Sequence, residues 1–586
     1  MSRTRYLVAL VRGPDARALV QRRINEFLPQ IPDLRIVLDA GEWLVFASGP
    51  PPIAVGGQGV LLGSFFIRGR AEPVPGLSPE IEAAVISSRG AWLIEAGWGP
   101  YICVLATPSR NNIEIVRGPF GDLPCYVAQS EDGLLAASDV SLLLAAGLAR
   151  PRFDPTAVAR HLAAPDIHRS ETCLSGVSAL RGGERLSASA GALTRDVLWS
   201  PWALTGPEKR LLDHDEAARR IRDSARHCVA ARSGLRSHIL LKLSGGLDSS
   251  IVAACLAAAG RPCTALTLAT DDKAADERGY ARLAANSISI PLVERYRDVG
   301  SVAPRRSAAA RLPRPSARSF AQDSARIAGE VALEVGADVV FDGGGGDNIF
   351  CSLQSVRPAT DCLSAPDGRG AFLTTAAAIA ELAQVSLLAV AGRAWLASWR
   401  RSPAYRWPLD LRFLAAPARD AARGASAHPW LDPPAGALPG TAAHVALITG
   451  AQSVVEGFDA EEPLSTCSPL ISQPLIEACL RVPSWLWYED GQNRAIARRA
   501  FAGLLPEGTI RRRSKGAPDS FVADIYDANR LVVRDLLLGG VLCQQGLLDI
   551  GALAAFLADG GPVRGHDYLR VMQLADAEAW ARCWSE

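Results

Sequence analysis

A glycine-rich turn between an apolar strand and a helix constrains the fold of this chain more than any other segment. Residues 238–243 form an apolar run that is broken only by Lys242, and residues 244–250 read SGGLDSS. Residues 248–259 then have the pattern of a helix. A strand that passes through a tight turn directly into a helix is typical of an α/β domain with a parallel sheet.

Further strands and helices alternate after this turn. Residues 264–269 predict a second strand, residues 276–285 a second helix and residues 337–341 a later strand. Parallel strands joined through helices require right-handed crossovers. We therefore expect the later part of the chain to contain one parallel sheet.

The earlier part of the chain has a different pattern. Between residues 36 and 126, short β-like runs are separated by Gly and Pro, which is typical of antiparallel strands. The clearest runs are residues 60–67, 92–96, 101–106 and 113–116. A polar stretch near residues 205–213 separates the two patterns, so we predict two domains, 1–208 and 209–586.

The turn at residues 244–250 is suited to binding phosphate. Paired glycines let backbone N–H groups approach an anion, and the helix N-terminus behind them favours negative charge. The Lys-Ser/Thr pair of a Walker A loop does not follow the glycines, so the usual grip on a γ-phosphate is missing. A pyrophosphate, released by cleavage between the α- and β-phosphates of ATP, fits this turn better.

A second acidic glycine turn follows the strand at residues 337–341. Residues 342–348 read DGGGGDN, and ligands of open α/β sheets collect at the carboxyl ends of the strands. Asp248 and Asp347 would then share one crevice and hold Mg²⁺, which prefers a few carboxylates and phosphate oxygens. The alternative is that each turn is only a glycine-rich link from strand to helix, but two such turns in one domain favour the nucleotide site.

These motifs resemble the asparagine synthetase superfamily, whose synthetase domain carries an SGGxDS pyrophosphate loop and makes acyl-adenylates. Residues 117–126 (RGPFGDLPCY) resemble the family's RDPFG-x-(K/R)PLYY segment, and residues 134–138 resemble its LxFASE strand. The resemblance implies an α/β protein with an N-terminal glutaminase-like (Ntn) antiparallel αββα domain. It also implies a C-terminal PP-loop ATP pyrophosphatase domain that uses ATP and Mg²⁺.

Three departures from the family change the expected chemistry. Class II glutaminases use an N-terminal Cys, but this chain has Ser2, so we expect no glutamine hydrolysis. Gly344 stands where asparagine synthetases have a Glu and β-lactam synthetases a Tyr. Residues 470–472 read LIS in place of the family's FLD, which indicates a remodelled acceptor pocket.

An inactive glutaminase domain beside an adenylating site indicates an amine that arrives on the substrate itself. Lasso peptide cyclases carry a GGGGDN turn and an LSQPL segment, which resemble residues 343–348 and 470–475 (LISQPL) here. This resemblance implies a macrolactam synthetase that adenylates an Asp or Glu side chain of a precursor peptide and closes a ring with the peptide's α-amine. A β-lactam synthetase-like cyclase, an asparagine synthetase using free ammonia and a non-catalytic nucleotide-binding scaffold are the alternatives.

The resemblance also assigns roles to individual residues. Lys515 matches the family's catalytic Lys, although a basic run such as RRRSK is often only a solvated face. Arg494 aligns with a family Lys or only caps a helix, and Asp276 and Glu277 are interpreted as charges at a helix N-terminus. The expected catalytic residues are Lys515, Asp347, Asp248 and Arg494; the expected metal ligands are Asp248 and Asp347; and the expected nucleotide-binding residues are Leu243, Ser244, Gly245, Gly246, Asp248, Ser249, Leu268 and Gly343.

Composition excludes several other classes of protein. The chain has 62 Lys+Arg and 61 Asp+Glu, which argues against a nucleic-acid partner. Residues 376–390 are interrupted by Glu381 and Gln384, so we expect one largely buried helix rather than membrane insertion. The expected location is cytoplasmic. The expected partners are a precursor peptide and, in the same pathway, a leader peptidase and a leader-recognition protein.

Overall fold

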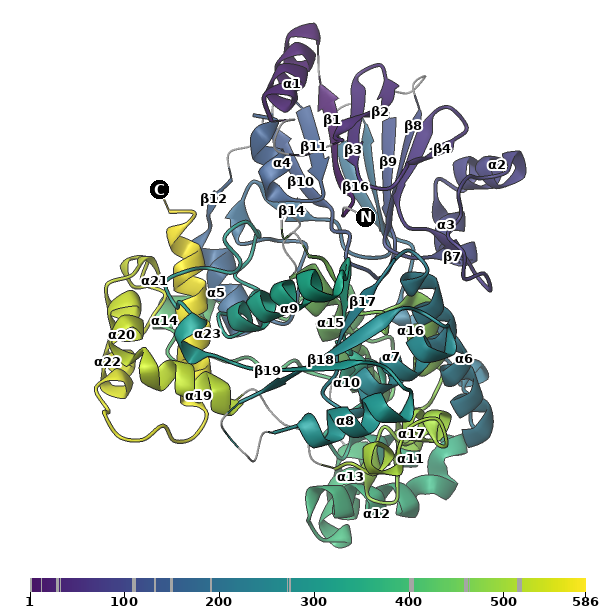
Figure 1. Cartoon of the computed structure of the whole chain (residues 1–586), viewed down its shortest axis with the longest axis vertical. Coiled ribbons are helices and arrows are strands. Elements are labelled where there is room, and N and C mark those ends of the chain that lie inside the picture. Colours follow the sequence, from purple (N-terminus) through teal and green to yellow (C-terminus); the bar gives the residue numbers. More distant parts are fainter. Residues whose placement is uncertain are drawn as a thin grey trace.

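The computed structural model shows an antiparallel N-terminal part and a parallel C-terminal part (Figure 1). It describes residues 3–585 except 12, 28–30, 32, 108–111, 131–132, 148–150, 190–191, 271, 273–275, 400–404, 458–461, 463 and 514–518.

Two antiparallel sheets form the N-terminal part. The first has the order β14-β10-β11-β1-β3-β2, and the second has the order β16-β15-β9-β8-β5-β4. The strands of the first sheet are β1 (Arg5–Val11), β2 (Arg35–Ala40), β3 (Trp43–Ser48), β10 (Tyr126–Ser130), β11 (Gly133–Ala137) and β14 (Val177–Ala179). Those of the second are β4 (Ile53–Val55), β5 (Gly59–Gly63), β8 (Tyr101–Thr107), β9 (Asn112–Arg117), β15 (Glu184–Ser189) and β16 (Ala192–Val197).

Alternate side chains of these strands face two different layers. Val8 and Val104 contribute to a core between the two sheets, because successive residues of a strand point to opposite faces. The outer face of the first sheet packs against α1 (Pro14–Phe27) and α4 (Val140–Ala145). The outer face of the second packs against α2 (Pro79–Ser87) and α3 (Ala91–Ala96). The predicted αββα layering is confirmed.

One expected strand in this part is wrong. Residues 92–96 lie in the helix α3, which buries Leu93 and Ile94. An apolar run of this length fits a buried strand and a buried helix equally well, so its periodicity could not separate them. Gly90, which precedes α3, has φ 82°, a left-handed backbone conformation that glycine adopts without strain.

The C-terminal part contains the predicted parallel sheet, with the order β19-β18-β17-β20-β21. Leu240 and Val340 pack with α9 on one face, whereas Ile239 and Leu241 pack with α6 and α7 on the other. The elements are β17 (Ile239–Lys242), β18 (Cys263–Ala269), β19 (Leu292–Tyr296), β20 (Val339–Phe341), β21 (Thr466–Cys467), α6 (His214–Ser233), α7 (Leu247–Ala258), α8 (Arg278–Ser287) and α9 (Ala321–Val335).

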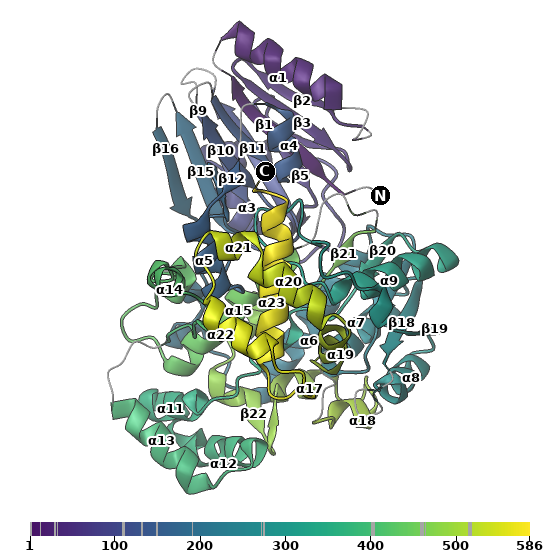
Figure 2. The ribbon, with the colours of Figure 1, turned by 90° about the vertical axis from the view of Figure 1, so that its left-hand side faces the viewer.

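Further helices surround this sheet, and those of the C-terminal segment gather beside it (Figure 2). They include α5 (Pro155–Ala163), α10 (Gly346–Ile349), α11 (Arg357–Ser364), α12 (Phe372–Ala383), α13 (Leu387–Trp399), α14 (Ala416–Ala421), α15 (Pro439–Glu456), α16 (Gln473–Leu480), α17 (Ala495–Phe501), α18 (Glu507–Ile510), α19 (Asp519–Ala528), α20 (Arg530–Leu538), α21 (Val541–Gln544), α22 (Ile550–Leu557) and α23 (Asp567–Arg582). Short strand pairs are β6 (Phe66–Ile67) with β7 (Gly97–Trp98), β12 (Arg152–Phe153) with β13 (Leu174–Ser175), and β22 (Tyr488–Glu489) with β23 (Gln492–Asn493).

The single buried helix expected at residues 376–390 is also wrong. Two helices, α12 and α13, meet at a turn in which Gln384 has φ 53°. Of α13, only Val390 and Ala394 are buried. Apolar composition predicted burial, but the fold leaves most of this helix at the surface.

Ion pairs join the two parts. Arg117, from β9, donates from Nη2 to Oε1 of Glu456 on α15 at 2.6 Å, and both side chains are buried. Arg68 pairs with Glu477 of α16 at 2.6 Å. The boundary at residue 208 stays a prediction; β16 ends at Val197 and α6 begins at His214. In the part of the chain that the structure describes, no helix is long and apolar enough to cross a membrane.

Candidate active site

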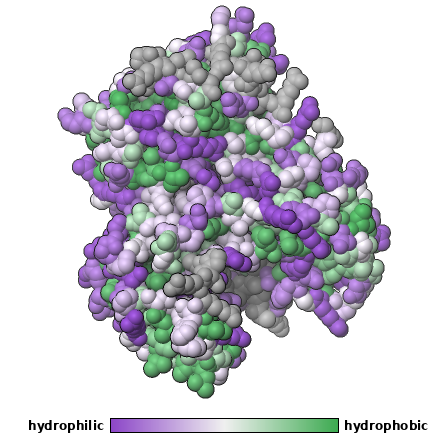
Figure 3. Space-filling view, turned by 180° about the vertical axis from the view of Figure 1, so that it is seen from behind, coloured by the Kyte–Doolittle hydropathy of each residue, from purple (hydrophilic) through white to green (hydrophobic). Residues whose placement is uncertain are grey.

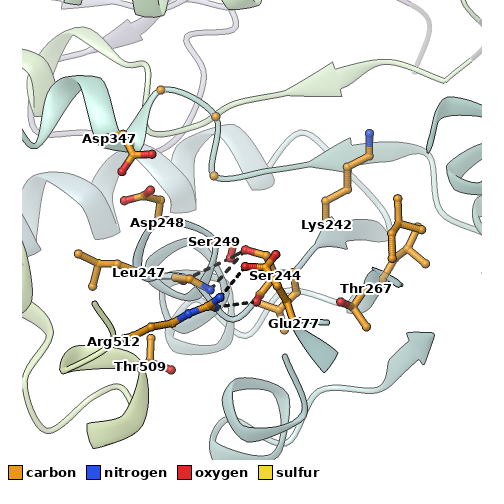
Figure 4. A pocket seen from close by; sticks show the side chains of 18 of the residues that line it. Lys242, Ser244, Leu247, Asp248, Ser249, Thr267, Glu277, Asp347, Thr509 and Arg512 are labelled. Atoms are coloured by element: carbon orange, nitrogen blue, oxygen red, sulfur yellow. Dashed lines mark hydrogen bonds and ion pairs between the residues drawn. The ribbon is translucent and has the colours of Figure 1, made fainter. Parts of the chain in front are cut away.

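A cavity of about 420 Å³ lies at the carboxyl ends of β17 and β20 (Figure 4). Both glycine turns open into it, so the crevice expected from the sequence is present. The predicted residues that line it are Leu243, Ser244, Gly246, Asp248, Ser249, Leu268, Gly343, Asp347 and Arg494. Gly245 lies in the same turn without lining the cavity. Lys515 lies outside the described residues, and its role stays a prediction.

The backbone of the first turn packs closely against the backbone of α8. Gly245 has φ 66°, and a Cβ there would lie 2.3 Å from the carbonyl carbon of Tyr280, so α8 packs directly on the turn. The hydroxyl oxygens of Ser244 and Ser249 lie 3.3 Å apart. The two hydroxyls and the N-terminus of α7 therefore face one place, as an anion site requires.

The second turn packs against the first. A Cβ on Gly343 would lie 2.6 Å from the amide nitrogen of Ser249, so only glycine permits this approach. Asp342 accepts hydrogen bonds from the amide of Gly344 at 2.9 Å and from Oγ of Ser468 at 2.6 Å. Asp342 thus fixes the turn and leaves Asp347 to face the cavity.

Arg494 joins the two carboxylates that the sequence assigned to a metal. Its Nη1 lies 3.1 Å from Oδ2 of Asp248 and also donates to Oδ1 of Asp347. Figure 4 shows the two carboxylates turned toward each other. Arg494 precedes α17 with φ 57° and makes no side-chain cap hydrogen bond. Its side chain therefore binds the two carboxylates of the site and does not cap the helix.

The two carboxylates fit a magnesium ion. Their oxygens converge on one nitrogen atom, so a single cation at that point would contact both. Mg²⁺ is commonly bound by one or two carboxylates together with substrate phosphates, and Asp248 and Asp347 provide that donor set next to the phosphate turn. Mg²⁺ held there would neutralise negative charge on the phosphates.

A second cavity, of about 990 Å³, continues from the first. Asp347, Arg494 and Arg513 belong to the walls of both cavities. The outer wall of the second cavity is largely apolar and comes from α12, α13 and the segment after α10. Its apolar side chains are Leu353, Val356, Ile379, Leu382, Ala383, Val385, Ala389 and Val390. The first cavity, which we name the nucleotide cavity after the function expected of its two glycine turns, therefore opens into a larger, mainly apolar space.

A family model described as "Asparagine synthase" matches residues 220–582, which is more than half of the chain. The chain belongs to the asparagine synthase family. Members of this family generally use ATP and Mg²⁺ to form amide bonds, and the matched residues contain both glycine turns and the parallel sheet. No curated protein matches the chain.

Two solved structures are also similar to the chain. One is a glutamine phosphoribosylpyrophosphate (PRPP) amidotransferase from B. subtilis complexed with ADP and GMP, at 9% identity over 58% of this chain and 90% of that one. The other is the allosteric regulatory enzyme of purine biosynthesis, at 8% identity over 58% and 89%. Each TM-score is 0.22. The sheets of this asparagine synthase-family chain itself, and not these two similarities, define its fold.

Arg512 and Glu277 form part of this site, although neither residue was predicted to belong to it. Nη2 of Arg512 donates to Oε1 of Glu277 at 2.7 Å, Nη1 donates to the carbonyl oxygen of Ser244 at 3.3 Å, and the guanidinium lies 4.0 Å from the ring centre of Tyr280. Both Arg512 and Glu277 line the nucleotide cavity. Glu277 is therefore more than a charge at a helix N-terminus. The available signal for it was residues 276–281 (DERGYA), which resemble the DE-x-x-YA helix of the asparagine synthetase superfamily.

Lys242 was also missed. It is the last residue of β17 and lines the nucleotide cavity. Burial lowers the pKa of its ammonium group, and the nearby carboxylate of Asp342 opposes that shift. Its signal in the sequence was a lone charge in an apolar strand directly before the phosphate turn.

Neither Cys103 nor Cys125, two buried cysteines of the N-terminal part, has an activated thiol. Cys103 is buried in β8, and burial raises the pKa of its thiol to about 12. Burial also raises the pKa of Cys125. Both thiols therefore stay protonated and unreactive near neutral pH. Ser2 lies outside the described residues.

Proposed function

We propose that this chain is an ATP-dependent lasso peptide cyclase, which joins the α-amine of a precursor peptide to the carboxylate of an Asp or Glu side chain in the same peptide. The observation that carries the proposal is the large cavity that adjoins the nucleotide cavity at Asp347, Arg494 and Arg513. At about 990 Å³ against about 420 Å³, it is much larger than a single amino-acid substrate needs. Apolar walls favour a peptide with apolar side chains.

The reaction would take place where the two cavities meet. A carboxylate oxygen of the peptide attacks the α-phosphorus of ATP, the bond to the β-phosphate bridging oxygen breaks, and an acyl-adenylate and pyrophosphate result. The α-amine then attacks the acyl carbon, the bond to AMP breaks, and the nitrogen loses a proton as the amide forms. Asp248 lies on the nucleotide side of this junction, and Asp347 lies at the junction itself.

The side chains of the junction would orient the reactants and stabilise charge. Ser244, Ser249 and the backbone amides of the first turn would hold the pyrophosphate oxygens. Arg494, released from the two carboxylates when Mg²⁺ neutralises them, would face the phosphates. Holding an amine and an adenylate in one cavity gives effective molarities worth roughly 7–11 kcal/mol. The apolar walls would limit hydrolysis of the adenylate by excluding water.

The test uses the full chain with ATP, Mg²⁺ and a synthetic peptide from a small reading frame beside this one, carrying a free α-amine and an internal Asp or Glu. Mass spectrometry should show a product lighter than the peptide by one water, with one AMP released per product. The same peptide with an acetylated α-amine should give no ring. A Ser2→Ala variant should cyclise the peptide as the wild type does, because no glutamine hydrolysis is needed.

Other results would select a different function. Cyclisation of a small β-amino acid, with no reaction of the peptide, would indicate a β-lactam synthetase-like enzyme. Ammonia-dependent conversion of aspartate would indicate an asparagine synthetase. Nucleotide binding with no substrate-dependent AMP release would indicate a scaffold, and each of these results would overturn the proposal.

A further inference from the structure

The helix hairpin of α12 and α13 exposes many large apolar side chains. Figure 3 shows apolar residues gathered over the lowest lobe of the molecule, where this hairpin lies. Burial of one such side chain removes on the order of 100 Å² of apolar surface, so the set amounts to several hundred Å², the size that marks an interaction site. The exposed fractions are Leu373 66%, Val385 48%, Leu387 41%, Leu388 83%, Trp395 53%, Leu396 45% and Trp399 72%.

The outward side of α13 is a regular stripe. Leu388, Gly392, Trp395 and Trp399 have the spacing i, i+4, i+7 and i+11, which places them on one face of a helix. The buried residues Val390 and Ala394 lie on the opposite face. The rings of Trp395 and Trp399 are 5.0 Å apart. This stripe has the spacing of a helix–helix interface seam.

The stripe contains no charge. Arg393 is the sole charged residue of α13, and it lies off the stripe in the wall of the second cavity. In a two-fold symmetric interface the same patch meets itself, so any charge near the axis would face an equal charge. A charge-free stripe avoids that repulsion, whereas a surface for an acidic or basic partner would carry the complementary charge.

Large and small side chains are also arranged along the stripe so that two antiparallel copies of it would fit each other. The bulky indoles occupy the C-terminal half, and Gly392 and Leu388 occupy the N-terminal half. Around Gly392 the space is open, because a Cβ there would meet no atom within 4 Å. If two such helices pair antiparallel about an axis between residues 392 and 395, each Trp395 faces Gly392 and each Trp399 faces Leu388 of the other copy.

We propose that α13 is a homodimer interface, in which two copies of this chain pair antiparallel along the stripe Leu388–Gly392–Trp395–Trp399. The pairing is independent of the proposed function. It covers Leu388 and Trp399, the two most exposed large apolar side chains of the hairpin. It also fixes the helix whose inner side supplies Val385, Ala389 and Val390 to the second cavity.

Sedimentation equilibrium of the full chain over a concentration series tests the pairing. The wild type should reach twice the chain mass of 62.1 kDa. Gly392→Leu should raise the dimer dissociation constant at least about tenfold, because the new side chain occupies the space of the partner's indole. Gly329→Leu is the matched control: it too is a helical glycine whose Cβ would meet no atom within 4 Å, and it should leave the dimer unchanged.

A charge pair tests the antiparallel register. Leu388→Glu alone and Trp399→Lys alone should each weaken the dimer, whereas the double variant should recover it, because residue 388 of one copy faces residue 399 of the other. Recovery in the double variant also excludes misfolding as the cause. A monomeric wild type at every concentration, a dimer unaffected by Gly392→Leu, or a monomer that binds anionic lipid vesicles through Trp395 would each overturn the proposal.

Discussion

Asp248 and Asp347, which are 99 positions apart in the chain, accept hydrogen bonds from one and the same atom, Nη1 of Arg494. The carboxylates come from two different glycine turns that touch where Gly343 approaches Ser249. Two like charges so close would repel each other without a counter-charge. The guanidinium of Arg494 provides such a counter-charge, and in the proposed reaction Mg²⁺ would provide it.

Removal of either carboxylate should stop adenylation. We expect Asp248→Asn and Asp347→Asn each to reduce substrate-dependent AMP release at least about 100-fold, since the site loses one of its two carboxylate ligands to the metal. Asp276→Asn is the control, because Asp276 binds Arg278 outside the cavity. Thermal unfolding should show all three variants folded. Wild-type AMP release in either site variant would contradict the shared metal site.

Arg494 should compete with Mg²⁺ for the two carboxylates. In Arg494→Ala the two carboxylates lose the guanidinium of Arg494, so the variant should unfold at a lower temperature than the wild type without metal. Added Mg²⁺ should then raise its unfolding temperature more than that of the wild type, because metal binding stabilises the folded state by mass action. Arg494→Lys, which keeps the charge, should resemble the wild type. An equal response of all three proteins to Mg²⁺ would refute the competition.

The parts of the site that follow from local sequence were predictable. A strand that ends in Ser-Gly-Gly and continues as a helix determines where backbone amides point, so Ser244, Gly246 and Ser249 were found without a structure. Asp248 and Asp347 were found because the carboxyl ends of parallel strands share one edge of the sheet. The antiparallel strands of the N-terminal part followed from short β-like runs separated by Gly and Pro, whereas the αββα layering was implied by the family resemblance.

The parts that depend on distant packing were not predictable. Arg512 and Glu277 are separated by 235 positions. The sequence pattern of a basic run or of acidic residues at a helix start is the same whether or not their side chains form an ion pair. The exposure of α13 has the same origin: its apolar composition fits a buried helix, and only the fold determines which face other elements cover. Residues 92–96 were assigned to the wrong element because their run was too short for its period to decide.

The Arg512–Glu277 pair should shape the ATP site. Arg512→Ala removes the guanidinium that joins Glu277, Tyr280 and the carbonyl of Ser244, so we expect KM for ATP to rise about tenfold with a smaller change in kcat. Glu277→Gln should have a similar effect, and the double variant should cost less than the sum of the two. Steady-state kinetics of AMP release measures all three.

A neighbouring arginine provides the control for that experiment. Arg511 is 77% exposed at its side chain and pairs with Glu507 one helical turn away. Such surface pairs contribute little free energy, so Arg511→Ala should leave KM for ATP unchanged. If Arg511→Ala and Arg512→Ala raise KM equally, the effect belongs to the positive charge of the run and not to the pair.

Asp361 should make the stability of the chain depend on pH. Its carboxylate is buried on α11 and accepts hydrogen bonds from the amides of Gly440 and Thr441 and from Oγ of Ser484. Burial raises its pKa to about 6, against about 3.9 for an unfolded chain. Between these two values the folded chain holds a proton that the unfolded chain has lost, so the free energy of unfolding falls as pH rises.

The Asp361→Asn variant isolates this contribution, because an amide does not titrate. From pH 4 to pH 7 the free energy of unfolding of the wild type should fall by on the order of 2 kcal/mol relative to that of the variant. Urea unfolding at each pH measures the difference, and pH effects of all other groups cancel in it. Asp367→Asn, a change at a partly exposed carboxylate that pairs with Arg210, is the control for altered surface charge. A difference between wild type and Asp361→Asn that stays constant with pH would show that burial does not hold a proton on this side chain.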